Sequence, residues 1–213
     1  MAPENGKHSK IEANDAIIAA GIGGGVAVYF YYILGQSSGG LIPESFTRWR
    51  WLLLVVFPLL AILGLQIAFL IGKKIPTIYQ LAKFLLVGAL AAILDLGMLN
   101  IFMNLGGAAS GAGFNIAKGL SFAIATSLKY FPDKRWAFKN KNRENLKREF
   151  GKFFAITLAG LALNIFIANI IVNQIGPQWG IGAELWANLG GIGAIMAVFI
   201  FNFLGYKILV FKK

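Results

Sequence analysis

The chain has 213 residues, of which 57% are apolar and only 14% are charged, and its mean hydropathy is +0.68. These values exclude an ordinary soluble domain and indicate a membrane protein. The net charge of +11 would suggest nucleic-acid binding in a soluble protein, but in a membrane protein it bears on orientation. The chain has no cysteine, which excludes disulfides, thiolate chemistry and cysteine metal sites.

Six apolar stretches of about 20 residues, each bounded by charge, are long enough to cross a bilayer. The first does not resemble a signal peptide, because Glu12 and Asp15 flank it and a Tyr-rich end replaces the small residues of a cleavage site. We therefore predict an all-α membrane protein with six transmembrane helices. In chain order the predicted spans are Ala16–Leu34, Trp51–Gly72, Ala82–Leu105, Phe114–Phe131, Phe153–Ile175 and Leu185–Tyr206.

The basic residues are distributed unevenly between the two sides of these spans. With the N-terminus inside, all but three of the 20 Lys and Arg residues fall in cytoplasmic segments, the exceptions being Arg48, Arg50 and Lys118. Cytoplasmic loops of membrane proteins carry such an excess of Lys and Arg. We therefore predict a multi-pass protein of the cytoplasmic (inner) membrane, with both termini and the polar loop at 139–152 in the cytoplasm.

Residues 1–79 are predicted to form an N-terminal hairpin of two membrane helices. Gly21 and Gly25 make a pair of small residues one helical turn apart, which favours close packing against another helix. Pro58 is expected to kink the second helix. The glycine run at 21–25 is not a phosphate-binding loop, because no Lys-Ser/Thr pair follows it.

Asp95 is the most informative polar residue of the third span. Counting about 1.5 Å per residue from Phe84 places it near mid-bilayer, where a charge costs about 2.5–3.5 kcal/mol on insertion scales and should therefore face protein or water. Lys118 in the fourth span is within reach as a neutralising partner. Two roles stay open for Asp95, a polar clasp between helices and a role in transport. Lys118 is alternatively a ligand for a substrate phosphate.

An internal repeat organises the chain after residue 80. Sliding the sequence by 69 residues places Lys83-Phe84 on Lys152-Phe153 and Asp95 on Asn164. Beyond a longer loop in the second copy, a slide of 73 residues aligns the polar ends of the helices. The aligned pairs are Asn115 with Asn188, Lys129 with Asn202, Lys134 with Lys207, and Phe138 with Phe211. Each copy has two spans, so the last four helices are predicted to form two parallel two-helix repeats, and transporters commonly bind substrate where such repeats meet.

Both copies end in a basic and aromatic segment at the predicted cytoplasmic interface. Lys134, Arg135 and Lys207 could bind a phosphate there, Arg in a bidentate manner and Lys as a point charge. The intramembrane amides could contact sugar hydroxyls or phosphate oxygens, and they are Asn115, Asn164, Asn188 and Asn202. The alternative is that the cations and aromatic residues only anchor helix ends at the interface.

These residues resemble the GtrA-like family of small membrane proteins. The family begins its repeat with Lys/Arg-Phe-Leu-Val-Gly and an acidic residue about a dozen positions on, which Lys83–Gly88 and Asp95 match. It closes the next helix with Asn-Phe-x-x-Asn-Arg/Lys-x-Trp-Val-Phe. The ends match in part, with Lys129 and Asp133 standing where the family has Asn. The resemblance covers residues 80–213, which we predict to be a GtrA-like four-helix membrane domain.

The resemblance implies translocation of a polyprenyl-phosphate-linked sugar for polysaccharide or glycolipid assembly. Two alternatives stay open: a membrane scaffold that docks a glycosyltransferase, and a small proton-coupled exporter that uses Asp95. The sequence has no Asp-x-Asp metal site, no paired carboxylates and no Ser/His arrangement, so we expect no enzyme, cofactor or metal. The expected partners are the membrane and the lipid-linked sugar, with a glycosyltransferase or a second copy of the chain as further candidates, and no nucleic acid.

Overall fold

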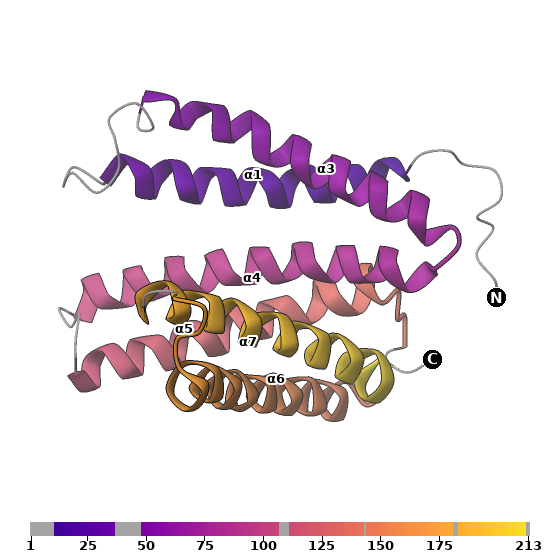
Figure 1. The fold of residues 1–213 in the computed structure, drawn as a ribbon. Helices are drawn as coiled ribbons and strands as arrows, with labels where there is room; N and C mark the ends of the chain where they lie inside the picture. Colours follow the sequence, from indigo (N-terminus) through magenta and orange to yellow (C-terminus); the bar gives the residue numbers. More distant parts are fainter. Residues whose placement is uncertain (1–10, 37–47, 107–110, 143, 181–182, 212–213) are drawn as a thin grey trace. The chain divides into compact units, whose positions relative to one another are not determined.

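The computed structural model of the protein describes residues 11–36, 48–106, 111–142, 144–180 and 183–211. Within these ranges the chain forms helices and turns and no strand. The long helices, shown in Figure 1, are α1 (Ala13–Gln36), α3 (Leu53–Gly72), α4 (Pro76–Gly106), α5 (Gly111–Pro132), α6 (Leu146–Asn169) and α7 (Ala183–Gly205). A short 3-10 helix, η1 (Arg50–Leu52), precedes α3.

The chain divides into two compact units. Residues 1–137 form the first, with α1, α3, α4 and α5, and residues 138–213 form the second, with α6 and α7. The boundary predicted between residues 79 and 80 follows the extent of the family resemblance and not the packing of helices, and it stays a prediction.

Five helices in the described ranges are long and apolar enough to cross a membrane. They cover Ala13–Tyr32, Arg50–Gly72, Pro76–Gly106, Leu146–Ile167 and Gly193–Val210. The stretch predicted as a fourth span does form a helix, α5, but polar residues such as Ser121, Thr126 and Lys129 reduce its apolar character. The all-helical membrane class is therefore confirmed, whereas the number of six spans stays a prediction.

A glycine brings α1 and α3 together. A Cβ added to Gly23 would lie 2.7 Å from the carbonyl oxygen of Phe57 and 2.8 Å from the Cα of Pro58, so only glycine fits this contact. Gly21 meets nothing within 4 Å, and Gly25 faces Leu90 and Ile93 of α4. The glycine run thus packs helices as predicted, but through Gly23, because the rotation of α1 decides which glycine meets the backbone of α3.

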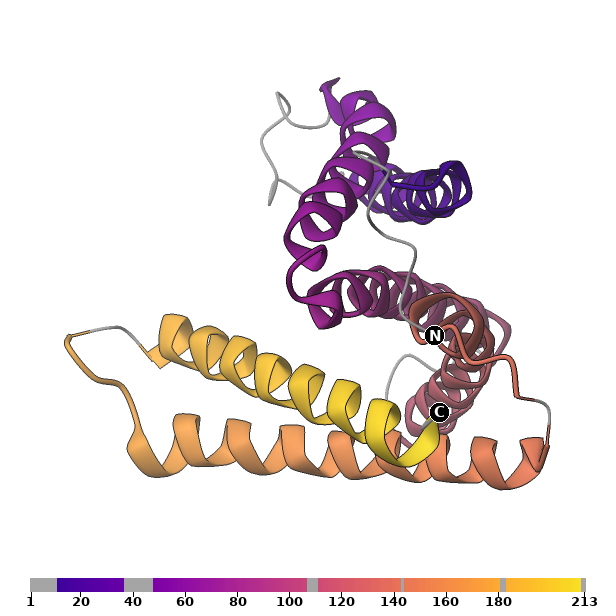
Figure 2. The ribbon, with the colours of Figure 1, turned by 90° about the vertical axis from the view of Figure 1, so that its right-hand side faces the viewer.

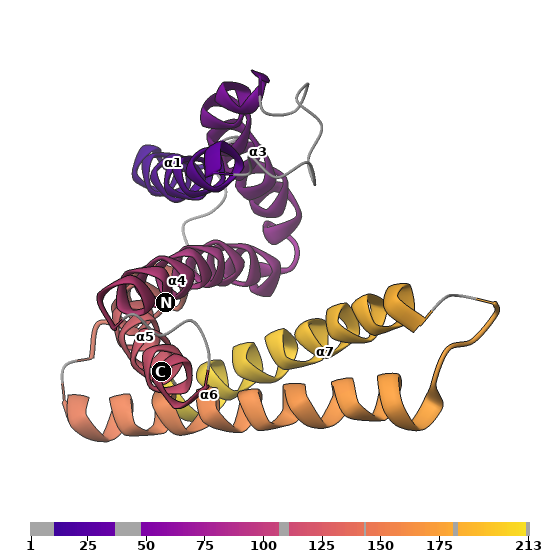
Figure 3. The same ribbon diagram turned by 90° about the vertical axis from the view of Figure 1, so that its left-hand side faces the viewer.

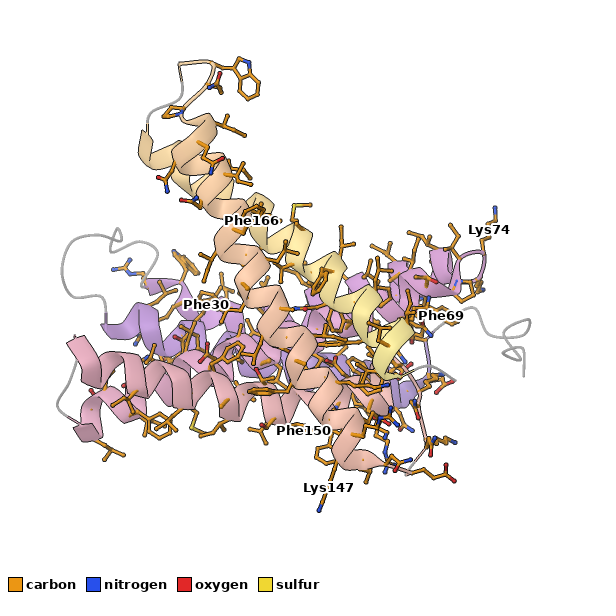
Figure 4. The ribbon with its side chains drawn as sticks, turned by 90° about the horizontal axis from the view of Figure 1, so that it is seen from below. Phe30, Phe69, Lys74, Lys147, Phe150 and Phe166 are labelled. Carbon is orange, nitrogen blue, oxygen red and sulfur yellow. The ribbon has the colours of Figure 1, made fainter. Side chains whose placement is uncertain are left out.

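Aromatic rings support the same hairpin and its connection to α4. The Phe30 ring of α1, labelled in Figure 4, stacks on Phe57 of α3 with centroids 5.7 Å apart. At the turn after α3, Phe69 meets the ring edge of Tyr79 at 5.4 Å. Pro76 opens α4, where its missing N–H leaves no helical hydrogen bond unmade.

Helices α6 and α7 make up most of the second unit. They lie closest near the C-terminal end of α7 and diverge toward the turn at 176–180, as Figures 2 and 3 show from opposite sides. Gly205 packs against Ile156, which a Cβ at Gly205 would meet at 2.9 Å. On the outer surface of α6, the Phe166 side chain is exposed, as expected of a residue that faces lipid.

Helices α5, α6 and α7 each end in a π-helical segment, namely η2 (Asp133–Ala137), η3 (Ile170–Ile175) and η4 (Tyr206–Val210). At η2 the cause is local, because Pro132 lacks the N–H that would continue the α-helical hydrogen bonds. A π-helical turn widens the helix and often marks a functional region. Segments η2 and η4 contain Lys134 and Lys207 of the predicted lipid-phosphate site.

Candidate functional site

A buried carboxylate in the first unit collects three hydrogen-bond donors. Asp15, in the first turn of α1, accepts hydrogen bonds at Oδ2 from the Tyr79 hydroxyl and from Lys83 Nζ, both at 2.5 Å. Its Oδ1 accepts a third from Trp136 Nε1 at 2.7 Å. Lys83 is 1% exposed and Asp15 is 5% exposed. This arrangement, which we call the Asp15 cluster, joins α1 to the start of α4 and to η2.

The ammonium group of the Asp15 cluster lies between two aromatic rings. Lys83 Nζ is 4.5 Å from the centroid of the Tyr79 ring and 5.3 Å from that of the Trp136 ring. Aromatic faces attract a desolvated cation. The Lys83 ammonium group therefore contacts both the carboxylate and the two rings.

This cluster was not predicted from the sequence. There Asp15 stands out only as an acidic residue beside the first apolar stretch, and Lys83 only as the start of a motif and of a repeat. The available signal was a carboxylate within the first turn of an apolar helix, since such a charge needs a partner in the membrane. The partners are far away in sequence, so their identity depended on the fold.

Asp95 is partly buried in α4 and is hydrogen-bonded to α5. Its Oδ1 accepts a hydrogen bond from the Ser121 hydroxyl at 2.6 Å, and Ser121 is fully buried. The predicted interior position of Asp95 thus comes with a partner that the sequence analysis did not name. The Lys118 side chain lies outside the described residues, so its pairing with Asp95 stays a prediction.

The cytoplasmic end predicted for α5 carries a group of buried charges. Asp133 is fully buried, and its Oδ2 lies 3.4 Å from Lys129 Nζ. Burial raises the pKa of Asp133 to about 7, against the opposing effect of the Lys129 charge. Lys129 in turn lies 4.3 Å from the centroid of the Phe84 ring. This end of the unit therefore holds charges out of water with few hydrogen bonds.

Lys134 is the most buried of the three cations predicted to bind phosphate. It is 2% exposed, and its Nζ donates a hydrogen bond of 3.5 Å to the Tyr130 hydroxyl. Arg135, its neighbour in η2, is exposed. Lys207 is partly exposed in η4, with its Nζ 5.7 Å from the Phe203 ring centroid. Because Lys207 belongs to the second unit, a joint site with Lys134 and Arg135 stays a prediction.

In the second unit, Tyr206 is the residue that the predicted repeat aligns with Asp133. The Tyr206 side chain is fully buried, its hydroxyl is hydrogen-bonded to that of Thr157, and its ring stacks on Phe153 with centroids 4.4 Å apart. Lys152 Nζ donates a hydrogen bond of 3.5 Å to the carbonyl oxygen of Leu209. The start of α6 is thereby fixed to η4.

Asn202 presents a buried amide oxygen toward α6. Its Oδ1 is buried and has no hydrogen-bond partner among the described residues, and a Cβ at Gly160 would lie 2.5 Å from it. An unmade hydrogen bond in a buried place is costly, so this oxygen is a candidate for contact with a ligand. Asn164 lies further along α6 and is partly exposed.

Two other predicted site residues have side chains that lie outside the description. Asn115 lies in α5 and Asn188 in α7, and their side chains are outside the described residues. The predicted row of amides therefore stays a prediction. In the described ranges no group of His, Asp and Glu residues is placed to hold a metal ion.

Comparison with known proteins gives one match. A family model described as "GtrA/DPMS, transmembrane domain" matches residues 83–211, which begin at Lys83 of the Asp15 cluster and end at Phe211 after η4. No curated protein matches the chain, and no solved structure matches it.

Proposed function

Because the chain belongs to the GtrA/DPMS transmembrane-domain family, we propose that it translocates a polyprenyl-phosphate-linked sugar across the cytoplasmic membrane for polysaccharide or glycolipid assembly. Membership in the family indicates a multi-pass membrane protein involved in the handling of polyprenyl-phosphate sugars. The proposal includes the inner membrane as the protein's location and a transport role without catalysis.

The observation that carries the proposal is the burial of lysines inside an apolar helical bundle. Lys83 and Lys134 are 1% and 2% exposed, within the part of the chain that the family model matches or at its first residue. A phosphate-sugar head group loses water when it enters a membrane and needs charges and hydrogen-bond donors in return, whereas its polyprenyl tail can stay in hydrocarbon. Buried cations next to lipid-facing helices supply what the head group needs.

We assign Lys134, Arg135 and Lys207 to the cytoplasmic phosphate contact, and the intramembrane polar residues to the path of the sugar. The buried amide oxygen of Asn202 and the Asp95–Ser121 pair are polar groups inside their own units, and they offer acceptors and donors to sugar hydroxyls.

We further propose that the two hairpins, α4–α5 and α6–α7, are two copies of one repeated unit. The π-helical segments η2 (Asp133–Ala137) and η4 (Tyr206–Val210) support this, because the slide of 73 residues that aligns Lys134 with Lys207 also superimposes both ends of these segments.

Reconstitution tests the proposal. Liposomes containing the purified protein and polyprenyl-phosphate hexoses are treated with periodate, which does not cross the membrane and oxidises only outward-facing sugar. We expect nearly all of the sugar to be oxidised with the protein and about half without it. Lys134→Gln and Lys207→Gln should each slow the reaction, about tenfold for the loss of a contact to a charged group, and the double variant should be slower still.

Lys147→Gln is the matched control, because Lys147 is an exposed lysine at the start of α6 that projects from the ribbon in Figure 4. An oxidised fraction of sugar that is the same with and without the protein would contradict translocation. If the protein neither binds nor moves these lipids but co-purifies with a glycosyltransferase and raises its activity, the scaffold function replaces the transport function.

A further inference from the structure

The Asp15 cluster has the composition of an anion-binding site. Lys83, Tyr79 and Trp136 are all donors, they come from α4 and η2, and all three point at one carboxylate. Without that carboxylate, an ammonium, a phenol and an indole N–H would surround a buried space with positive charge. Two neutral donors, the Tyr79 hydroxyl and the Trp136 N–H, thus converge with the ammonium group on one negatively charged acceptor.

A phosphodiester resembles the Asp15 carboxylate that accepts hydrogen bonds from these donors. A polyprenyl-phosphate sugar carries one negative charge shared by two non-bridging phosphate oxygens, and the Asp15 carboxylate likewise shares one charge between two oxygens. In the structure one carboxylate oxygen accepts two of the hydrogen bonds and the other accepts the third. Charge-assisted hydrogen bonds of this kind are the strong ones in phosphate recognition.

The extent of the family match separates the donors from the carboxylate. Lys83 and Trp136 lie within residues 83–211, which match the family model, whereas Asp15 lies on α1, outside the match. Two of the three donors thus belong to the shared membrane domain, and the acceptor belongs to the additional hairpin.

We propose that Lys83, Tyr79 and Trp136 form a binding site for the phosphate of a lipid-linked sugar, and that Asp15 is an internal ligand which the phosphate displaces. The source of the phosphate rests on the proposed function. The site adds to the contact assigned to Lys134, Arg135 and Lys207. Through Asp15, the α1–α3 hairpin lowers the affinity of the membrane domain for its lipid.

A structural role for the ion pair is the competing explanation. Buried ion pairs often contribute little to stability compared with apolar residues of the same size. The two explanations predict opposite effects of removing the Asp15 charge on ligand affinity, which makes them distinguishable.

The test measures binding of farnesyl methyl phosphate, a short phosphodiester, to the full-length protein in nanodiscs, with farnesol as the uncharged control. We expect Asp15→Asn to bind the phosphodiester about tenfold more tightly than the wild type, which corresponds to the loss of a competing contact to a charged group. Lys83→Gln should weaken binding about tenfold, because it removes the charged donor of the site. Glu12→Gln is the matched control, because Glu12 is an exposed carboxylate just before α1, and it should bind like the wild type.

Unchanged or weaker binding by a folded Asp15→Asn variant would overturn the proposal. If this variant does not fold, the double variant Asp15→Leu/Lys83→Met replaces the pair by apolar residues. Weaker phosphodiester binding by the double variant than by the wild type supports the site, and binding equal to that of the wild type overturns it.

The two proposals fail separately. Absence of sugar movement in liposomes, with tighter phosphodiester binding by Asp15→Asn, would remove the transport function and leave the site in place. Sugar movement in liposomes, with no effect of Asp15→Asn on phosphodiester affinity, would remove the proposed site and leave the transport function in place.

Discussion

At the scale of single residues, the protein accommodates each buried charge in a different way. Lys83 has a carboxylate and two aromatic rings around it. Asp95 has the hydroxyl of Ser121. Asp133 has an ion-pair contact with Lys129 at 3.4 Å and no hydrogen bond from the described residues. The energetic consequences differ accordingly, and two of these groups give direct tests.

Asp133 should make stability depend on pH. Its pKa is about 7 in the folded protein because burial disfavours the charged form, whereas an unfolded Asp has a pKa of about 3.9. Between these values the folded state binds more protons than the unfolded state, so this contribution to stability is complete below about pH 4 and is lost as the pH rises to about 7.

Asp133→Asn should remove this part of the pH dependence, because the amide resembles the protonated acid and does not titrate. The measurement is the thermal unfolding midpoint in detergent between pH 5 and pH 8. Glu144→Gln, at an exposed position, is the control. A pH dependence of Asp133→Asn equal to that of the wild type would contradict the assigned role.

Ser121→Ala should destabilise the contact between α4 and α5. The change leaves Asp95 without one of its hydrogen bonds, at a cost of about 1–3 kcal/mol in the free energy of unfolding. A double-mutant cycle with Asp95→Asn measures the coupling. Strictly additive effects of the two changes would show that the hydrogen bond contributes nothing.

At the scale of elements, close contacts between helices depend on single glycines and on where helices end. Because Gly23 has no side chain, the backbone of α3 can approach it closely, and Gly160 likewise allows the close approach of the Asn202 side chain of α7. In membranes, where apolar burial does not distinguish helix partners from lipid, such close contacts select the partner. The π-helical segments η2 and η4, which follow α5 and α7, contain Lys134 and Lys207.

Gly23→Ala and Gly24→Ala should therefore have opposite effects. Both changes improve helix propensity by up to about 1 kcal/mol, but only the methyl group at Gly23 collides with the Phe57 carbonyl, which typically costs about 1–3 kcal/mol. Thermal unfolding in detergent should show Gly24→Ala equal to or above the wild type and Gly23→Ala below it. Equal stability of the two variants would exclude the tight contact between α1 and α3.

At the scale of the whole molecule, the distribution of Lys and Arg predicts the orientation. The protein has no cysteine, so single cysteines report position without background. A cysteine that replaces Asn142, in the loop before α6, should be labelled by an impermeant maleimide only after the cells are permeabilised. Cysteine at Gln178, in the turn after η3, should be labelled in intact cells. The reverse pattern would overturn the predicted orientation.

The sequence by itself determined the class of the protein. Hydropathy and charge act locally, so the membrane class, the helical structure and the family followed from runs of apolar residues and from the motif at Lys83–Gly88. Most helix ends also followed to within three residues, because charges and prolines mark them, but α4 and α6 begin six and seven residues before the predicted spans.

Only the tertiary structure decided which polar groups meet. Asp15 is 68 positions from Lys83 and 121 positions from Trp136, and nothing in the local sequence connects them. Likewise, Gly23 and not its neighbours contacts α3. The physical reason is that an apolar helix has low amphipathicity, so its rotation about its own axis is set by contacts with other helices. That rotation chooses the partner of each buried charge, and with it the candidate site.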